Sequence, residues 1–195
     1  MRLSDFERFQ KILLHWNKIH NLTAITDPQE IAIKHFEDSL APLPHLPQGG
    51  RLLDIGAGSG FPGIPLKIER PDLEVVLLDG RHKKVDFCNI VIQELGLKNI
   101  EALHGRAEDK SVQKKLGLFD IVISRATFPL DKFLKASLPY PKENGILIAM
   151  RGREWEKELK EIKIPANLKL VQKYPYSLSQ EMGERALLIF RIWEC

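Results

Sequence analysis

Residues 52–63 read Leu52-Leu53-Asp54-Ile55-Gly56-Ala57-Gly58-Ser59-Gly60-Phe61-Pro62-Gly63, an apolar run and one aspartate followed by four glycines within eight positions. Glycine adopts positive φ at little cost and carries no side chain that would hold a ligand away from the backbone. Pro62 suits the first turn of a helix, whose free N–H groups would then face the same ligand. The stretch therefore predicts a buried strand, a ligand-binding turn and a helix.

Short apolar runs alternate with amphipathic segments in the rest of the chain. This pattern predicts strands at 52–55, 74–79, 99–103, 119–124 and 145–150, separated by helices at 62–69, 81–95, 108–116, 129–137 and 153–162. Strands separated by helices pair in parallel, whereas the last two segments, 168–174 and 185–193, have only a loop between them and can form an antiparallel hairpin. We therefore expect an α/β fold with a doubly wound sheet, mostly parallel with one antiparallel strand near its edge.

The first fifty residues predict helices rather than strands. Ser4 and Glu7 form a capping-box pattern, and apolar residues then recur every three or four positions to about His20. Asp27 and Pro28 predict the start of a second helix that ends soon after Leu40, before a Pro- and Gly-rich linker at 42–50. The expected organisation is a helical extension at 1–50 and an α/β domain at 51–195.

Composition is that of an ordinary globular protein. The 195 residues are 44% hydrophobic and carry a net charge of +3, which permits a nucleic-acid partner without requiring one. Cys88 and Cys195 lie far apart, so the pattern predicts neither a metal site nor a disulfide framework, but reduced thiols in the cytoplasm. The start of the chain shows no apolar signal region and no run of eighteen apolar residues follows, so we expect no membrane association.

The glycine run fits two cofactor patterns. Gly58 to Gly63 matches G-x-G-x-x-G, and Asp79 follows twenty-one residues beyond its first glycine, as in NAD-binding proteins. In the other register, Asp54-x-Gly56-x-Gly58-x-Gly60 is the acidic and glycine pattern of S-adenosylmethionine-dependent methyltransferases. Only this register explains Asp54, because a carboxylate can anchor the turn and approach a cationic amino-acid group but would repel a pyrophosphate.

Two acidic residues follow the next two expected strands. Asp79 could accept hydrogen bonds from ribose hydroxyls with either cofactor. Glu108, in the turn Gly105-Arg106-Ala107-Glu108, could accept one from an adenine amino group, so that the two carboxylates would bracket a nucleoside. The alternative is that both residues only cap the helices that start there.

The residues Asp54 to Leu66 closely resemble the signature of the small-subunit (16S) ribosomal RNA guanine-N7 methyltransferase G family, also called the glucose-inhibited division protein B family. Further blocks are similar in the same order along nearly the whole chain: Trp16-Asn17, 21–25, 35–40, Leu77-Leu78-Asp79, Arg106-Ala107-Glu108 and 123–126. One departure is Arg151-Gly152, where the family usually has Lys-Gly; a planar fork replaces a point charge there.

This resemblance implies a Rossmann-like enzyme that transfers the methyl group of S-adenosylmethionine to N7 of a guanine in the 530 loop of 16S ribosomal RNA. Its partner would be 16S ribosomal RNA or the small ribosomal subunit, and we expect the enzyme to be a monomer without a metal. The cofactor contacts that it implies, together with Gly58 of the glycine register, are Gly56, Gly58, Phe61, Asp79, Gly80, Arg81, Ala107, Glu108 and Arg125.

The residues near the expected site suit a methyl acceptor that carries no proton. Ser124-Arg125-Ala126-Thr127 stands where amine methyltransferases usually have Asp/Asn-Pro-Pro-aromatic, and Cys88 lies mid-helix as a small buried hydrophobe rather than a nucleophile. Guanine N7 presents a lone pair, so the transfer needs alignment and no general base. For Arg125 we expect a positioning role, because a cation at the methyl group would oppose the charge transfer.

His35 and Asp38 lie three residues apart on the second expected helix, either facing the catalytic pocket or forming a structural pair. Asn21 and Thr23 are weaker candidates that could equally be turn residues.

The basic residues Arg81 to Lys84, with Arg151 and Arg153, could contact RNA phosphates or form a solvated face. Tyr174, Tyr176 and Trp155 could stack on bases but suit packing better. Two other function classes remain open at this point: an NAD-dependent reductase, which lacks evident hydride chemistry here, and a non-catalytic RNA-binding module.

Overall fold

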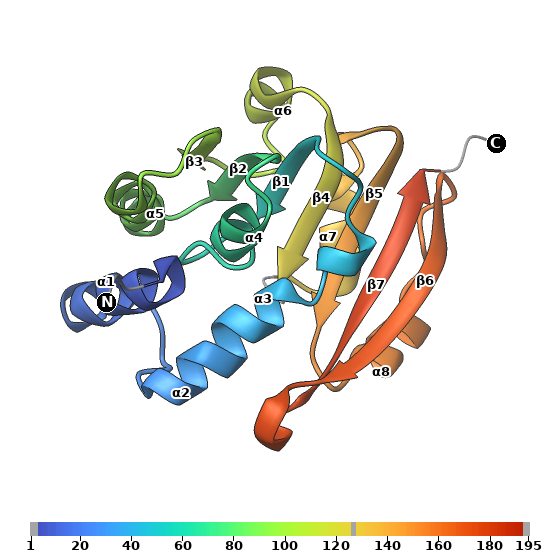
Figure 1. The fold of residues 1–195 in the computed structure, drawn as a ribbon. Coiled ribbons are helices and arrows are strands. Elements are labelled where there is room, and N and C mark those ends of the chain that lie inside the picture. Colours follow the sequence, from blue (N-terminus) through green and yellow to red (C-terminus); the bar gives the residue numbers. More distant parts are fainter. Residues whose placement is uncertain (1–3, 126–127, 193–195) are drawn as a thin grey trace.

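The computed structural model describes residues 4–125 and 128–192. They form one seven-stranded sheet in the order β3-β2-β1-β4-β5-β7-β6 (Figure 1). The strands are β1 (Arg51–Ile55), β2 (Glu74–Asp79), β3 (Ile100–His104), β4 (Phe119–Arg125), β5 (Pro141–Arg151), β6 (Leu168–Ser177) and β7 (Glu184–Ile192). Strands β1 to β5 pair in parallel, and β7 runs antiparallel to both of its neighbours. The expected fold class is confirmed, with the reversed strand one place in from the edge.

The helices that follow β1 to β5 are α4 (Gly63–Glu69), α5 (His82–Leu95), α6 (Lys110–Leu116), α7 (Leu130–Ser137) and α8 (Trp155–Glu161); a short 3-10 turn, η3 (Ser179–Glu181), precedes β7. Buried residues form two clusters. One joins α4 and α5 to the N-terminal helices, and the other joins α7 to Leu116 at the end of α6 and to the opposite side chains of the strands. No helix among the described residues is long and apolar enough to cross a membrane.

The N-terminal segment begins with α1 (Asp5–His20), where Ser4 and Glu7 form the predicted capping box. The second helical stretch is capped by Asp27 and runs through α2 (Pro28–Ile31), a π-helical segment η1 (Ala32–Glu37) and α3 (Asp38–Leu40), before the 3-10 turn η2 (Leu43–His45). In Figure 1 the arrowhead of β4 ends beside α3, so this stretch covers the carboxyl end of the central strands. π-helical turns occur frequently at functional sites.

The N-terminal helices share their core with the sheet. Phe9, Leu13 and Ile31 are fully buried in the same cluster as Leu52 and Ile121 of the central strands. Burial of one such side chain contributes about 1.5–3 kcal/mol. These helices are therefore held against the sheet by apolar contacts, which fixes the position of His35 and Asp38 over the strand ends.

Candidate active site

The glycine turn follows β1 with left-handed backbone at alternate positions. Gly56, Gly58 and Gly60 have φ of 72°, 57° and 87°. The N–H of Gly56 donates to the carbonyl of Leu78 at 2.7 Å, which joins the turn to the neighbouring strand β2. A side chain at Gly58 would have space, because the nearest atom would lie 3.9 Å from a Cβ there. Packing therefore leaves room at this position, and glycine is favoured there by the left-handed backbone.

Asp54 anchors this turn from within the core. The side chain is fully buried, and its Oδ2 accepts a hydrogen bond of 2.9 Å from the N–H of Gly63 at the start of α4. Burial raises the pKa of this carboxyl to about 7. The hydrogen bond to Gly63 confirms the predicted anchoring role. Asp54 lines none of the three clefts described below, and its approach to a cofactor stays a prediction.

The expectation that the first N–H groups of the helix after the turn face the ligand is wrong. The N–H of Gly63 donates to Asp54, and that of Ile64 donates to the carbonyl of Gly60 at 2.8 Å. A Cβ at Gly63 would approach the Cδ2 atom of Leu77 to 2.2 Å, which shows how closely this helix end lies against β2. The helix N-terminus is thus used for packing, and the turn before it is left for a ligand.

A cleft of about 380 Å³ opens at the carboxyl ends of β1, β2 and β3. Its lining brings together six of the expected cofactor residues, and it comprises Ile55, Gly56, Leu78, Asp79, Gly80, Arg81, Gly105, Arg106, Ala107, Glu108 and Phe128. We call this the nucleoside cleft.

Asp79 is the buried acid of the nucleoside cleft. Its Oδ2 accepts from the N–H of Gly58 at 2.9 Å, and its Oδ1 accepts from the N–H of Arg81 at 2.9 Å. Nε of Arg81 also donates to Oδ1, at 3.3 Å. A carboxylate has about four acceptor positions, so Oδ2 keeps one for a hydroxyl donor. Asp79 therefore shapes both the glycine turn and the next turn while still presenting acceptors to the cleft.

Glu108 is exposed and precedes α6, whose N-cap position is Asp109, so the helix-cap alternative for Glu108 is not supported. The neighbouring Ala107 is held by its carbonyl, which accepts from the Tyr140 hydroxyl at 2.8 Å and from Gln113 Nε2 at 3.0 Å. Sequence reasoning missed Tyr140 and Phe128, because apolar or aromatic residues next to strands give no local sign of a cleft.

A second cleft, of about 300 Å³, shares Gly56 and Arg81 with the nucleoside cleft. Residues of the N-terminal segment and the end of β4 complete its lining, which comprises Leu22, Thr23, His35, Gly56, Ala57, Gly58, Ser59, Phe61, Arg81, Lys84 and Arg125. We call this the transfer cleft, because it connects the glycine turn to the candidate catalytic residues.

Lys84 is not available as part of an RNA-facing basic run. Its side chain is buried, and its ammonium donates to the carbonyl of Leu22 and to Ser59 Oγ, the latter at 3.0 Å. Burial lowers the pKa of this ammonium. Lys84 therefore connects the glycine turn to the N-terminal segment, and only its neighbours Arg81, His82 and Lys83 are exposed.

His35 and Arg125 meet at the wall of the transfer cleft. Nη2 of Arg125 lies 3.2 Å from Nδ1 of His35, and Nε2 of His35 lies 3.0 Å from the Thr23 hydroxyl. Because a guanidinium only donates, Nδ1 must accept and Nε2 carries the proton. Burial and the charge of Arg125 lower the pKa of His35 to about 4, so the ring is neutral at physiological pH.

The ring of Phe61 packs against both His35 and Arg125. Its ring is stacked between Phe9, at a centroid distance of 5.0 Å, and His35, at 4.6 Å. The guanidinium of Arg125 lies 5.1 Å from the centroid of the same ring. The cofactor contact expected for Phe61 therefore coincides with a packing role under His35.

Asp38 is the buried carboxylate that joins three strands' side chains. It pairs with Arg125 at 3.2 Å, accepts from the Tyr176 hydroxyl at 2.8 Å, and lies 3.8 Å from Nε of Arg185. The two residues proposed from their spacing thus both converge on Arg125, which sequence could not show. Tyr176 and Arg185 were not recognised as parts of this site, and Tyr176 is engaged here rather than free to stack on a base.

A third cleft, of about 450 Å³, continues from the transfer cleft through His35 and Arg125. Four cationic side chains and one buried carboxylate line it, and its residues are Ile25, Lys34, His35, Asp38, Arg125, Met150, Arg151, Gly152 and Arg185. We call this the cationic cleft. Its charge suits an anionic ligand such as a polynucleotide.

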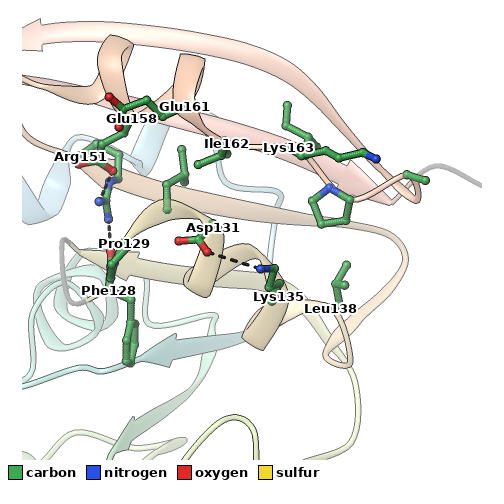
Figure 2. Close-up of a pocket in the computed structure, with 14 residues that line it drawn as sticks. Phe128, Pro129, Asp131, Lys135, Leu138, Arg151, Glu158, Glu161, Ile162 and Lys163 are labelled. Atoms are coloured by element: carbon green, nitrogen blue, oxygen red, sulfur yellow. Dashed lines mark hydrogen bonds and ion pairs between the residues drawn. The ribbon is translucent and has the colours of Figure 1, made fainter.

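Arg151 and Arg153, expected to contact phosphates together, differ in exposure. Arg153 is 79% exposed in its ion pair with Glu184. Arg151 is 7% exposed, donates to the carbonyl of Phe128 at 2.7 Å and pairs with Glu158 of α8 (Figure 2). Only Arg153 is therefore presented to solvent.

The remaining candidates divide between packing and surface. Trp155 is half-buried against the second core cluster, as the packing interpretation predicted, whereas Tyr174 is 41% exposed. Cys88 is buried, its thiol donates to the carbonyl of Gly58 at 3.4 Å, and burial raises its pKa, so it is no nucleophile. Cys195, Ala126 and Thr127 lie outside the described residues. Within the described ranges, no cluster of three or more His, Cys, Asp or Glu could hold a metal ion.

Comparison with known proteins adds the family to this geometry. Residues 2–187 match the model of the GidB family, described as rRNA small subunit methyltransferase G. The chain belongs to this family. Relatives named ribosomal RNA small subunit methyltransferase G are 41% identical in Lachnoclostridium phytofermentans, over 97% of the chain and 81% of the relative, and 41% identical in Lactococcus lactis, over 83% and 70%.

The rRNA small subunit methyltransferase G family membership confirms the expected resemblance and enzyme class, and it replaces the NAD-dependent reductase alternative. Solved structures with the same fold include TrmN from Thermus thermophilus, with a TM-score of 0.63 at 17% identity over 80% of the chain and 47% of that protein. A mutant of MtNAS in complex with S-adenosylmethionine has a TM-score of 0.64 at 16% identity, over 96% of the chain and 72% of that protein. At these identities the likeness concerns the fold alone.

Proposed function

We propose that this chain transfers the methyl group of S-adenosylmethionine to N7 of a guanine in the 530 loop of 16S ribosomal RNA, in line and without a general base. The proposal places the reaction in the cytoplasm and the enzyme as a monomer. It divides the chain into a helical extension at 1–50, which supplies His35 and Asp38, and a methyltransferase domain at 51–195.

The residues at the strand ends fit S-adenosylmethionine. The left-handed glycines leave the backbone open to close approach, and Asp79 retains acceptors in a position suited to ribose hydroxyls. Glu108, Ala107 and Phe128 also line the nucleoside cleft, and an adenine would lie beside them. The two clefts share Gly56 and Arg81, so a bound cofactor would extend past these residues from the nucleoside cleft into the transfer cleft. The bound cofactor supplies an electrophilic methyl group on a sulfonium.

The observation that carries the proposal is the adjacency of three clefts that share lining residues and hold no poised base. The nucleoside and transfer clefts share Gly56, and the transfer and cationic clefts share His35 and Arg125. His35 is neutral with Nδ1 already accepting, and Asp38 is held by Arg125 and Tyr176. A ring nitrogen with a lone pair needs no proton removed, so alignment is sufficient.

Arg125 and His35 would act as positioning residues on this account. Arg125 is fixed by Asp38 and by the carbonyl of Lys34 at 3.0 Å, so its charge is held at one place beside the transfer cleft. The cationic cleft would then hold the RNA backbone with Lys34 and Arg185, and its phosphate contacts would position the guanine without reading sequence.

Transfer of labelled methyl to small-subunit RNA from an unmethylated strain, followed by mapping of the modified base, tests the proposal. We expect one label per RNA, on a guanine of the 530 loop and released by the depurination chemistry that N7-methylguanine allows. Label on an exocyclic amine, a ring carbon or a ribose would refute the N7 assignment. A single-turnover experiment with no transfer at saturating protein would favour a non-catalytic RNA-binding module instead.

A further inference from the structure

A further cleft, of about 1130 Å³, lies between α7, α8 and the segment at 162–166 (Figure 2). Arg151 and Phe128 lie on its inner wall. Phe128 also lines the nucleoside cleft, and Arg151 also lines the cationic cleft. Each of these two residues therefore lies between this cleft, at α7 and α8, and a cleft of the candidate active site.

The guanidinium of Arg151 is committed to protein acceptors. Nη1 donates to the carbonyl of Phe128 at 2.7 Å, Nη2 pairs with Glu158, and Nε is buried with no hydrogen-bond partner among the described residues. A charged group as buried as this requires such partners. An RNA phosphate would have to compete with the charge-assisted hydrogen bonds that Arg151 already makes to Phe128 and Glu158.

The partner that matters for function is Phe128. It is the first described residue after β4 and Arg125, and its carbonyl is the point at which Arg151 holds the chain before α7 begins. Its half-buried side chain packs on the second core cluster and forms one wall of the nucleoside cleft, together with Asp79 and Glu108. Movement of this backbone would change the width of that cleft.

From these contacts we propose that Arg151 is a positioning residue for the cofactor: anchored by Glu158 of α8, it holds Phe128 as a wall of the nucleoside cleft. The inference rests on the cofactor part of the proposed function. An arginine fork can bond two acceptors in different directions at once, which a single ammonium at this position does less well.

Binding of S-adenosylhomocysteine, measured by calorimetry, tests this without any RNA. We expect Arg151→Lys and Glu158→Gln each to raise the Kd roughly 5- to 20-fold, in the range of one charge-assisted hydrogen bond. Glu158→Gln keeps the shape of the side chain and leaves Arg151 in place, so it remains informative if Arg151→Lys folds poorly. Arg153→Lys, at an exposed arginine two residues away, is the matched control and should leave the Kd within twofold.

Two further measurements separate positioning from phosphate binding. In steady state, Arg151→Lys should raise KM for S-adenosylmethionine by a larger factor than it changes kcat or KM for RNA. Phe128→Leu should weaken S-adenosylhomocysteine binding similarly, and the double variant with Arg151→Lys should lose less than the product of the two effects.

The salt dependence of RNA binding gives the opposing outcome. If Arg151 bound a phosphate, Arg151→Met, which removes the charge, would reduce the magnitude of the slope of log K against log salt by up to about 0.7–0.9 and leave the Kd for S-adenosylhomocysteine unchanged, and the inference would be overturned. Unchanged cofactor binding in both Arg151→Lys and Glu158→Gln would overturn it as well. Wild-type protein that failed to bind S-adenosylhomocysteine would instead refute the proposed function.

Discussion

The carboxylate of Asp79 accepts a hydrogen bond of 2.9 Å from the backbone N–H of Gly58, twenty-one residues earlier in the chain. The end of β2 and the turn after β1 are therefore held together by the same side chain that presents acceptors to the nucleoside cleft. A change at either residue affects both the shape of the turn and its chemistry.

Asp79→Asn should weaken binding of S-adenosylhomocysteine roughly 10- to 100-fold, because hydrogen bonds to a charged acceptor are worth about 1.5–3 kcal/mol. Gly58→Asp should weaken it by more than about tenfold, since it places a second carboxylate beside Asp79 in the turn. Circular dichroism would show that the fold is kept. Asp86→Asn, on the exposed side of α5, is the control. Unchanged affinity in both variants would mean that the glycine turn has another purpose.

Asp38→Ala should lower turnover and also destabilise the protein by about 3 kcal/mol, because it leaves the buried Arg125 without its carboxylate. His35→Ala should lower turnover roughly 10- to 100-fold through loss of alignment. Both should leave the affinity for S-adenosylhomocysteine within twofold. Glu30→Gln, in the exposed pair with Lys34, should change stability by less than about 1 kcal/mol. Full turnover in both the His35 and Asp38 variants would make the pair purely structural.

The stability of the protein should depend on pH through His35. Its pKa of about 4 in the folded protein lies below the 6.5 of an unperturbed histidine, so the unfolded chain binds more protons between these values. The stability that the neutral His35 contributes to the free energy of unfolding is fully present above pH 6.5 and is lost as pH falls toward 4. The free energy of unfolding of wild type relative to His35→Gln should therefore rise over this window, by about 1–3 kcal/mol.

Urea unfolding at several pH values measures this difference, with His15→Gln on the exposed face of α1 as the control. Because His35 is neutral across the working range, its titration should leave kcat unchanged between pH 6 and 8. A sigmoidal loss of kcat with a midpoint near pH 6.5 that disappears in His35→Gln would contradict the neutral assignment.

Cys88→Ala should retain turnover within about twofold and reduce stability by about 1 kcal/mol, since the thiol makes one weak hydrogen bond to Gly58 in a buried site. Turnover and thermal unfolding of the same preparation measure both effects. A loss of turnover above about 100-fold in a folded variant would point to covalent chemistry. It would also exclude the transfer mechanism proposed for guanine N7.

Most elements of the fold follow from local patterns. The capping box at Ser4, the alternation of apolar runs with amphipathic segments, and the glycines after β1 each act within a few residues, and the structure confirms the elements that they predict. The features that were predicted wrongly depend on residues far apart in the sequence. The N-terminus of α4 is closed because Asp54 lies beneath it, and Lys84 is buried because Leu22 and Ser59 surround its ammonium.

The sequence by itself determined the α/β class, the order of strands and helices, the glycine turn at 54–63 and the family resemblance, because periodicity and turn residues act locally. Only the tertiary structure decided which side chains meet. Arg125 and Tyr176 lie 87 and 138 positions beyond Asp38 in the chain, yet both contact its carboxylate, because the sheet brings β4 and β6 to the N-terminal helices. A buried charge is stable only when the fold places hydrogen-bond partners around it. For Arg151 these partners are the carbonyl of Phe128 and the carboxylate of Glu158.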